Sequence, residues 1–217
     1  MQDGQNLFHP QTAYKGRAWE LDKSSRNAIK NNEISPCIIV GISNVDTRFF
    51  EYFPQKATVY LTKDDYVLME QGGLEQASDT SNYLADNYLK FLVNELKPFI
   101  DKNYRTKTEA ASTAIGGSSS GALISLYAIC EYPQIFGQAA CISTHWPVLF
   151  DNEFISPSES IRTYLKHKLP DPKTHRIYFD HGTLAIDRFY EVHQIKVDQL
   201  MLEKGYIKGK NWETLKF

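Results

Sequence analysis

The sequence predicts an α/β fold built around a mostly parallel β-sheet with helices on both faces. Strand-like apolar runs alternate with helix-like periodic runs along the 217 residues, which is the order that produces such a sheet. The length suits one domain with a large buried core. We therefore expect a single domain over residues 1–217.

The composition excludes two classes of partner. Hydrophobic residues make up 42% and charged residues 23% of the chain, and the net charge is −2. Basic residues are scattered, which gives neither an electrostatic footprint for nucleic acid nor a basic run for a membrane surface. No apolar stretch reaches the length that a bilayer requires. We expect no nucleic-acid and no membrane partner, and composition leaves the oligomeric state open.

The first half of the chain is predicted to be mainly helical with one buried strand. A helix is expected over residues 21–30, and the continuous β-branched run at residues 37–41 is typical of a strand covered on both faces. A long insertion over residues 43–76 includes residues 58–61 as a short strand. Residues 79–81 offer N-caps for a long helix. Its apolar stripe comprises Leu84, Tyr88, Leu92, Leu96, Phe99 and Ile100.

The second half of the chain alternates strands and helices up to its last residue. Strands are expected over residues 110–115, 138–143, 176–180 and 212–217. Helices are expected over residues 158–167 and 187–204, and Gly205 is the residue type favoured just past a helix end.

The cysteines indicate neither a metal site nor a disulfide framework. Cys37, Cys130 and Cys141 all lie in apolar runs, so we expect three buried thiols, and their spacing fits no known ligand pattern. No other metal-ligand spacing is present. We expect neither a metal nor a cofactor.

Both ends of the sequence are abrupt. Residues 1–4 resemble the exit of a missing strand, and residues 212–217 form a strand that nothing follows. We therefore expect a chain that is shortened at both ends. There is no signal peptide at Met1, but a shortened N-terminus could have lost one. The compartment stays open, with the cytoplasm as the default.

The segment Gly117-Ser118-Ser119-Ser120-Gly121 is the most informative for function. It follows a strand of small residues and opens an apolar helix, which is the context in which G-x-S-x-G forms a nucleophile elbow. The glycines let strand and helix pass at a distance too short for a Cβ atom. We predict that Ser119 is a nucleophile, and the alternative is an ordinary Gly/Ser turn.

A nucleophilic serine needs a histidine to take its proton and an acid to orient that histidine. The acid should lie just beyond a strand that follows the nucleophile. Asp187 has that position. The alternative interpretation is that Asp187 is a solvated aspartate at a helix N-terminus. Asp180 is the second candidate, although it could cap a turn instead. The histidine should follow the next strand, so we expect the base to lie beyond Phe217.

The histidines within the chain are assigned other places. His193 lies in the middle of a helix, as a surface or packing residue, and His175 is expected to be solvated. His181 lies near a strand end, on the wrong connection for a base. His145 could face the cleft, but it precedes the acid in chain order.

An oxyanion intermediate would need two backbone N–H donors. The N–H of Ser120, at the positive end of the predicted helix, is the first. The second should come from the loop after an early strand, and we assign it to Gln5 within residues 3–6. The alternative for this loop is a simple Asp-Gly turn.

Further motifs carry a family resemblance. Residues 3–8 have the pattern D-G-x-x-x-F, residues 48–54 the pattern R-x-x-E-Y-x-P, and residues 132–137 the pattern Y-P-x-x-F-G. A serine-to-tryptophan segment spans residues 143–146, and Gly182-Thr183 precedes the predicted acid. Together they resemble the putative esterase family of α/β-hydrolases, which includes esterase D, feruloyl and acetylxylan esterases, siderophore esterases and mycolyltransferases.

The resemblance implies an α/β-hydrolase fold and a serine esterase that needs no cofactor. It implies that residues 143–146, with His145 and Trp146, line the substrate pocket. It likens Asp187 to the acid of the family's G-T-x-D loop, although the spacing is longer here. The family's base lies in a G-x-x-H segment after the strand equivalent to residues 212–217.

The sequence thus predicts a serine carboxylic-ester hydrolase that forms an acyl-enzyme on Ser119. The expected substrate is a small-molecule or carbohydrate-linked ester. Tyr52, Phe53 and Trp146 suit an aromatic acyl group or a sugar, yet could equally pack the insertion. One alternative is an acyltransferase of the same fold, with a sugar hydroxyl in place of water. Another is a non-catalytic binding protein, because the expected histidine lies beyond the chain end.

Overall fold

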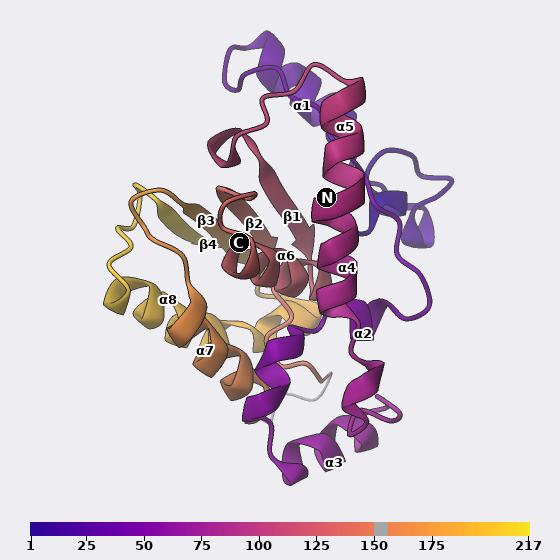
Figure 1. The fold of residues 1–217 in the computed structure, drawn as a ribbon, viewed down its shortest axis with the longest axis vertical. Helices are drawn as coiled ribbons and strands as arrows, with labels where there is room; N and C mark the ends of the chain where they lie inside the picture. Colours follow the sequence, from indigo (N-terminus) through magenta and orange to yellow (C-terminus); the bar gives the residue numbers. More distant parts are fainter. Residues whose placement is uncertain (150–155) are drawn as a thin grey trace. The chain divides into compact units, whose positions relative to one another are not determined.

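The computed structural model describes residues 1–149 and 156–217. They form two compact units, residues 1–48 and residues 49–217. Figure 1 shows the helices and strands of both units. None of the helices in the described ranges has the length and apolar character that crossing a bilayer demands.

The first unit contains one regular helix and two short turns. Helix α1 (Leu21–Lys30) covers the residues predicted for it. The 3₁₀ turns η1 (Gly4–Asn6) and η2 (Tyr14–Gly16) precede it.

The strand predicted over residues 37–41 is wrong. Val40 O accepts a hydrogen bond from the Met1 amino group at 2.7 Å, and Ile42 N donates to Met1 O at 3.0 Å. These bonds are too few for a strand ladder, so residues 37–41 pair into no strand within the described part of the chain. Ile38 is 50% exposed and the Cys37 thiol is exposed, so Cys37 is not the buried thiol that we expected. Cys130 and Cys141 are buried, as predicted.

The second unit begins with a helical region. Its elements are α2 (Arg48–Tyr52), η3 (Gln55–Tyr60), α3 (Lys63–Gln71), η4 (Thr80–Asn82), α4 (Ala85–Phe91), the π-helical turn η5 (Leu92–Leu96) and α5 (Lys97–Asn103). The short strand predicted over residues 58–61 is wrong, because a 3₁₀ turn covers most of it. There the Thr58 hydroxyl donates to Gln55 O at 2.7 Å, a local bond that favours a turn.

The long helix is present, but its start differs from the prediction. Asp79 caps the short turn η4 by accepting from Ser81 N at 2.9 Å, and the helix itself begins at Ala85. Helix α4, turn η5 and helix α5 run on without a break. Pro98 has no N–H group to donate a helix hydrogen bond, and the π turn η5 directly before it accommodates this missing bond.

A four-stranded parallel sheet forms the centre of the second unit, in the order β1-β2-β3-β4. The strands are β1 (Ala114–Ser118), β2 (Gln138–Ile142), β3 (Arg176–His181) and β4 (Trp212–Lys216). The predicted parallel sheet is confirmed. Strand β1 starts later than predicted, because Ser112 N and Thr113 N bond back to Glu109 O and Ala110 O in a turn.

Three helices follow in sequence after β1. They are α6 (Ser120–Glu131), α7 (Ser156–Lys168) and α8 (Glu191–Glu203), with the 3₁₀ turn η7 (Ala185–Phe189) before the last. Helix α6 packs on β1 and β2 and is buried on nearly all sides, not on one face. Below it, the inward side chains of the strands, such as Cys141 and Phe179, form the core of this unit.

Candidate active site

The carboxyl ends of the parallel strands bring the predicted catalytic residues to one edge of the sheet. Ser118, Ile142 and Asp180 are aligned in register across β1, β2 and β3. Ser119, Ser143 and Gly182 follow these strands within one or two residues. Ligands of open parallel α/β sheets bind outside this edge, so a chemical site is expected here.

Ser119 has a strained backbone at the turn between β1 and α6. Its φ is 58° and its ψ is −125°, a region that non-glycine residues rarely occupy. The turn is held on both sides: Ser119 N donates to Ile142 O at 3.0 Å, and Ser119 O accepts from Ala122 N at 3.0 Å and from His145 N at 3.3 Å. These bonds fix the serine at the carboxyl end of the strand.

Ser120 is the first residue of α6 and lies at its positive end. No side chain caps this end within the described part of the chain. The first N–H groups of a helix have no acceptor inside the helix, and the helix dipole favours negative charge beside them. The Ser120 N–H can therefore stabilise an anion that forms next to Ser119.

Asp187 lies in turn η7 and joins the loops after β2 and β3. Its Oδ2 atom accepts from Gly182 N at 2.9 Å and from the Ser143 hydroxyl at 2.5 Å. A Cβ atom on Gly182 would lie 3.2 Å from the same oxygen. The absence of a side chain at Gly182 therefore lets the carboxylate approach the backbone closely.

Asp180, the second candidate acid, is engaged differently. Its Oδ1 atom accepts from Ser143 N at 3.0 Å. Burial, followed by a hydrogen bond to Asp180, raises the pKa of the Tyr178 phenol to about 12. Asp180 therefore binds the Ser143 backbone N–H and the Tyr178 phenol, while Asp187 binds the Ser143 hydroxyl.

His145 and Tyr190 form a buried polar pair at the same edge. The His145 Nδ1 atom lies 2.9 Å from the Tyr190 hydroxyl, and the two rings meet edge to face. Burial raises the pKa of Tyr190, as does the charge of Asp187, whereas a hydrogen bond with the Ser119 side chain lowers that pKa. The Tyr190 hydroxyl thus has the His145 ring as its hydrogen-bond partner. Tyr190 could not be identified from the sequence, since nothing in its local pattern distinguishes it from a packing aromatic.

Three other histidines of the second unit have protein partners of their own. His193 is buried, as a packing residue would be, and burial followed by the charge of Arg162 lowers its pKa to about 4. His181 Nδ1 contacts Gly182 O at 3.0 Å. His175 was expected to be solvated, and this was wrong: it is 8% exposed, and its Nε2 atom lies 2.9 Å from Pro133 O, so a neighbouring loop covers the ring.

The predicted pocket aromatics lie deep in the second unit. Trp146 is fully buried, and its indole N–H donates to the Gln194 side chain at 2.8 Å. Tyr52 is also fully buried, with its ring centroid 5.4 Å from that of Tyr88. Contact of either ring with a substrate stays a prediction.

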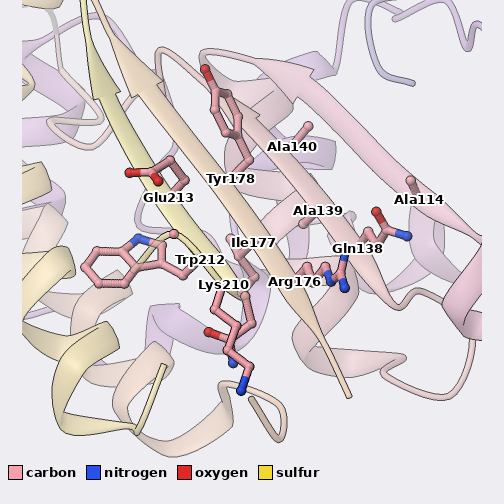
Figure 2. Close-up of a pocket in the computed structure, with 12 residues that line it drawn as sticks. Ala114, Gln138, Ala139, Ala140, Arg176, Ile177, Tyr178, Lys210, Trp212 and Glu213 are labelled. Atoms are coloured by element: carbon pink, nitrogen blue, oxygen red, sulfur yellow. The ribbon is translucent and has the colours of Figure 1, made fainter. Parts of the chain in front are cut away.

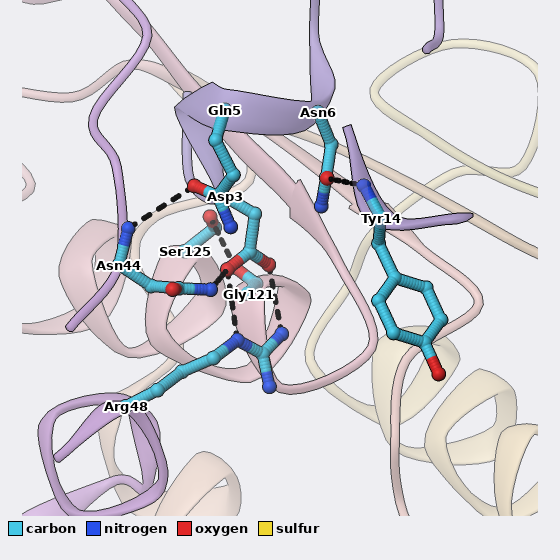
Figure 3. A network of polar contacts seen from close by, with 8 residues as sticks. All are labelled: Asp3, Gln5, Asn6, Tyr14, Asn44, Arg48, Gly121 and Ser125. Atoms are coloured by element: carbon cyan, nitrogen blue, oxygen red, sulfur yellow. Dashed lines mark hydrogen bonds and ion pairs between the residues drawn. The ribbon is translucent and has the colours of Figure 1, made fainter. Parts of the chain in front are cut away.

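The Gln5 loop is built within the first unit by a charged network (Figure 3). Asp3 has a left-handed backbone, and its carboxylate accepts from Arg48 Nε at 2.8 Å, Arg48 Nη2 at 2.7 Å and Asn44 Nδ2 at 2.6 Å. A Cβ atom on Gly4 would lie 2.5 Å from the backbone of Gly41, so glycine is required there. The motifs at residues 3–8 and 48–54 therefore meet through the Asp3–Arg48 pair, and the Gln5 loop follows directly.

A separate cavity of about 330 Å³ lies over the opposite end of the strands (Figure 2). Its lining includes Ala114, Gln138, Arg176 and Trp212, which are the first residues of β1 to β4. Because the strained serine is at the other end of β1, we do not assign this cavity to the chemistry at Ser119. In the ranges that the structure describes, no cluster of three or more His, Cys, Asp or Glu residues is arranged to hold a metal.

The parallel sheet, with a strained serine turn and an acidic loop at one edge, defines a protein of the α/β-hydrolase class. The fold is shared with the IroE-like serine hydrolase from Shewanella oneidensis (TM-score 0.64, 14% identity), where the match covers 100% of this chain and 61% of that chain. It is also shared with the enterobactin esterase FES from Shigella flexneri (TM-score 0.59, 15% identity), where the match covers 99% of this chain and 46% of that chain.

Residues 1–200 match the model of the family described as "Putative esterase", and the chain belongs to this family. A curated relative, the "Uncharacterized protein YbbA" of Bacillus subtilis, is 27% identical over 218 residues, which cover 97% of this chain and 72% of that protein. The family resemblance predicted from the motifs is confirmed. Membership supports ester hydrolysis as the general activity.

Proposed function

We propose that this protein is a serine carboxylic-ester hydrolase that forms an acyl-enzyme on Ser119. The observation that carries the proposal is the strained turn at Ser119, between a strand of the parallel sheet and the uncapped end of α6. A strand-to-helix turn of this kind exposes a serine hydroxyl in the enzymes that use a G-x-S-x-G nucleophile. Strain at a non-glycine residue is found preferentially at functional sites.

In the first step, Ser119 Oγ attacks the ester carbonyl carbon and the carbonyl oxygen becomes an oxyanion. The Ser120 N–H, at the positive end of α6, donates to that oxyanion. The second donor in this proposal is the N–H of Gln5, which rests on the family resemblance of residues 3–8. Collapse of the intermediate releases the alcohol, and water then hydrolyses the acyl-enzyme to the free acid.

A histidine takes the Ser119 proton and Asp187 orients it. The family resemblance assigns this histidine to the family's G-x-x-H segment. Asp187 suits the orienting role better than Asp180. The Oδ2 atom of Asp187 accepts hydrogen bonds from Gly182 and Ser143, while its Oδ1 atom has no hydrogen-bond partner among the described residues. Asp180 instead binds Ser143 N and the Tyr178 phenol.

The substrate in this proposal is a small-molecule or carbohydrate-linked ester. This class follows from family membership, and the chain's own residues give no finer assignment. A hydrolysis screen with acetyl, butyryl and feruloyl esters of p-nitrophenol and of sugars separates the candidate acyl groups.

Replacement of the nucleophile tests the proposed function. Ser119→Ala should reduce turnover of the best ester by roughly 10⁴- to 10⁶-fold with the fold intact, since binding and oxyanion donors alone remain. Ser125→Ala is the matched control, because this buried serine on α6 only donates to Gly121 O at 2.7 Å among the described residues (Figure 3). If Ser119→Ala retains more than a tenth of wild-type turnover, Ser119 is not the nucleophile. A protein that binds esters without hydrolysing them would also overturn the proposal.

A further inference from the structure

We propose that Gln194 is a positioning residue for the proposed acid, and that its side-chain amide anchors the loop that binds Asp187. This loop comprises residues 143–146 and follows β2. The inference rests on the proposed function of Ser119 and Asp187, and it adds a residue that the family motifs of the sequence do not include.

Three side-chain hydrogen bonds join this loop to the helical segment formed by η7 and α8. The bonds follow the two segments in the same order. They pair Ser143 with Asp187 at 2.5 Å, His145 with Tyr190 at 2.9 Å and Trp146 with Gln194 at 2.8 Å. Residues spaced by three and four positions share one face of a helical segment. The loop is therefore bound along its length to the segment that carries the proposed acid.

The backbone of the loop is strained, and these bonds hold it. Ser143 has a φ of 43°, and Val148, just past the loop, has a φ of 67°. Non-glycine residues seldom adopt a positive φ, least of all a β-branched residue such as valine. Such conformations persist only where the surrounding structure over-determines them. Loss of an anchor would let the backbone relax and turn the Ser143 hydroxyl away from Asp187.

The chemistry of its two partners fixes the direction of the Gln194 amide. An indole N–H can only donate a hydrogen bond, and a carboxylate can only accept one. Gln194 Oε1 therefore accepts from Trp146 Nε1 at 2.8 Å, and Gln194 Nε2 donates to Asp198 Oδ1 at 2.8 Å. Gln194 is 1% exposed, so an apolar side chain in its place leaves the buried indole N–H without an acceptor.

Strand β4 supports this amide from the sheet. The Thr214 hydroxyl donates at 2.8 Å to the same Asp198 oxygen that binds Gln194, and Thr214 lies in the middle of β4. A chain of hydrogen bonds thus runs from Trp146 through Gln194 and Asp198 to the sheet. Buried polar networks whose members are all satisfied rigidify the parts that they join. Gln194 therefore anchors the loop to a rigid part of the second unit.

A positioning role predicts slower turnover together with a changed pH profile. Misplacement of a catalytic group slows the chemical step, so loss of the anchor should lower kcat roughly 10- to 100-fold. A carboxylate close to a histidine raises the pKa of that histidine. A displaced Asp187 should therefore move the acidic limb of the kcat/KM profile to lower pH. A variant that is merely less stable has less active protein but an unmoved limb.

The first test compares Gln194→Leu with Gln199→Leu. Gln199 offers the same substitution on the exposed side of α8, where its amide donates to Glu203 Oε1 at 3.2 Å. Both variants are assayed on p-nitrophenyl butyrate between pH 5 and pH 9. We expect Gln194→Leu to lower kcat and move the acidic limb, while Gln199→Leu stays within about twofold of wild type. A normal kcat in Gln194→Leu, or a lower kcat with an unmoved limb, would overturn the inference.

An exchange of side chains provides a second test, which also decides the matter if Gln194→Leu fails to fold. Gln194→Glu keeps an acceptor for the Trp146 indole but places two carboxylates against each other. Adding Asp198→Asn returns a donor to that link at unchanged net charge, and the new amide oxygen can accept from Thr214. The double variant should regain most of the kcat that Gln194→Glu loses. A double variant that is no faster than Gln194→Glu would overturn the inference.

Ser119→Ala distinguishes failure of this inference from failure of the proposed function. If Ser119→Ala is inactive but Gln194→Leu keeps the wild-type rate and pH profile, only the positioning role is wrong. If Ser119→Ala stays active, the proposed function fails, and the positioning role fails with it.

Discussion

The Ser143 hydroxyl donates a 2.5 Å hydrogen bond to Asp187 Oδ2 and so fixes the proposed acid against the loop that follows β2. The backbone N–H of the same serine is bound by the other candidate carboxylate, that of Asp180, at 3.0 Å. The two carboxylates therefore both accept hydrogen bonds from Ser143. Asp180 thus binds the backbone N–H of Ser143, while Asp187 binds its hydroxyl.

Ser143→Ala should lower kcat by roughly 5- to 10-fold and leave KM nearly unchanged. The variant removes one of two donors to Asp187 Oδ2, and the Gly182 N–H at 2.9 Å remains. Steady-state kinetics on p-nitrophenyl butyrate measures both constants. A rate equal to wild type would show that the Ser143 hydroxyl does not help to hold the acid.

Asp187→Asn should lower kcat by roughly 10³- to 10⁴-fold with little change in KM, because the histidine loses its orienting partner. Asp180→Asn is the matched control, since it is the same change at the neighbouring carboxylate, and it should reduce turnover far less. Kinetics of both variants, with thermal unfolding to verify folding, gives the ranking. The reverse ranking would mean that Asp180 is the catalytic acid.

Arg48→Ala should destabilise the first unit by about 1–3 kcal/mol. The Asp3 side chain is 8% exposed. Removing the Arg48 guanidinium deletes two hydrogen bonds to the Asp3 carboxylate and leaves that negative charge nearly buried. Lys23→Ala is the control: the side chains of its ion pair with Glu20 are 63% and 46% exposed, so its loss should destabilise the protein far less. Urea unfolding of both variants measures the difference, and equal losses would contradict a structural role for the Asp3–Arg48 pair.

His193 should make the protein less stable as the pH falls from 6.5 towards 4. Burial lowers the His193 pKa from 6.5 to about 4, so across this window the unfolded state binds a proton that the folded state does not. Protonation therefore favours unfolding, by on the order of 2 kcal/mol at pH 5.

Urea unfolding at pH 7.5 and pH 5 measures this contribution. His193→Gln, which has no titrating ring, should lose less stability between these two pH values than wild type. Identical pH dependence in His193→Gln and wild type would show that this imidazole does not titrate differently in the folded state.

The mostly parallel sheet and the placement of Ser119 and Asp187 just beyond strands could be predicted from the sequence, because both follow from local patterns and chain order. Residues 37–41 show the limit of such patterns: an apolar β-branched run looks the same whether or not partner strands cover it. The short strand predicted over residues 58–61 is wrong for a similar reason, since a local hydrogen bond of the Thr58 hydroxyl favours a turn.

The parts of the site that the sequence did not reveal depend on contacts between distant segments. Tyr190 and His145 are 45 positions apart, and nothing in either neighbourhood indicates their hydrogen bond. The burial of His193 likewise depends on Ser158 and Arg162 on another helix. The sequence likewise does not indicate that Asp180 binds the Ser143 N–H while Asp187 binds the Ser143 hydroxyl.

Covalent labelling of the protein with an aryl phosphonate, followed by peptide mapping with mass spectrometry, tests most directly whether Ser119 is the nucleophile. The phosphonate mimics the oxyanion intermediate and stays attached to the serine that attacks it. We predict one adduct per chain, on Ser119, and no adduct in Ser119→Ala at the same reagent concentration. An adduct on another residue, or labelling that is unchanged in Ser119→Ala, would contradict Ser119 as the nucleophile.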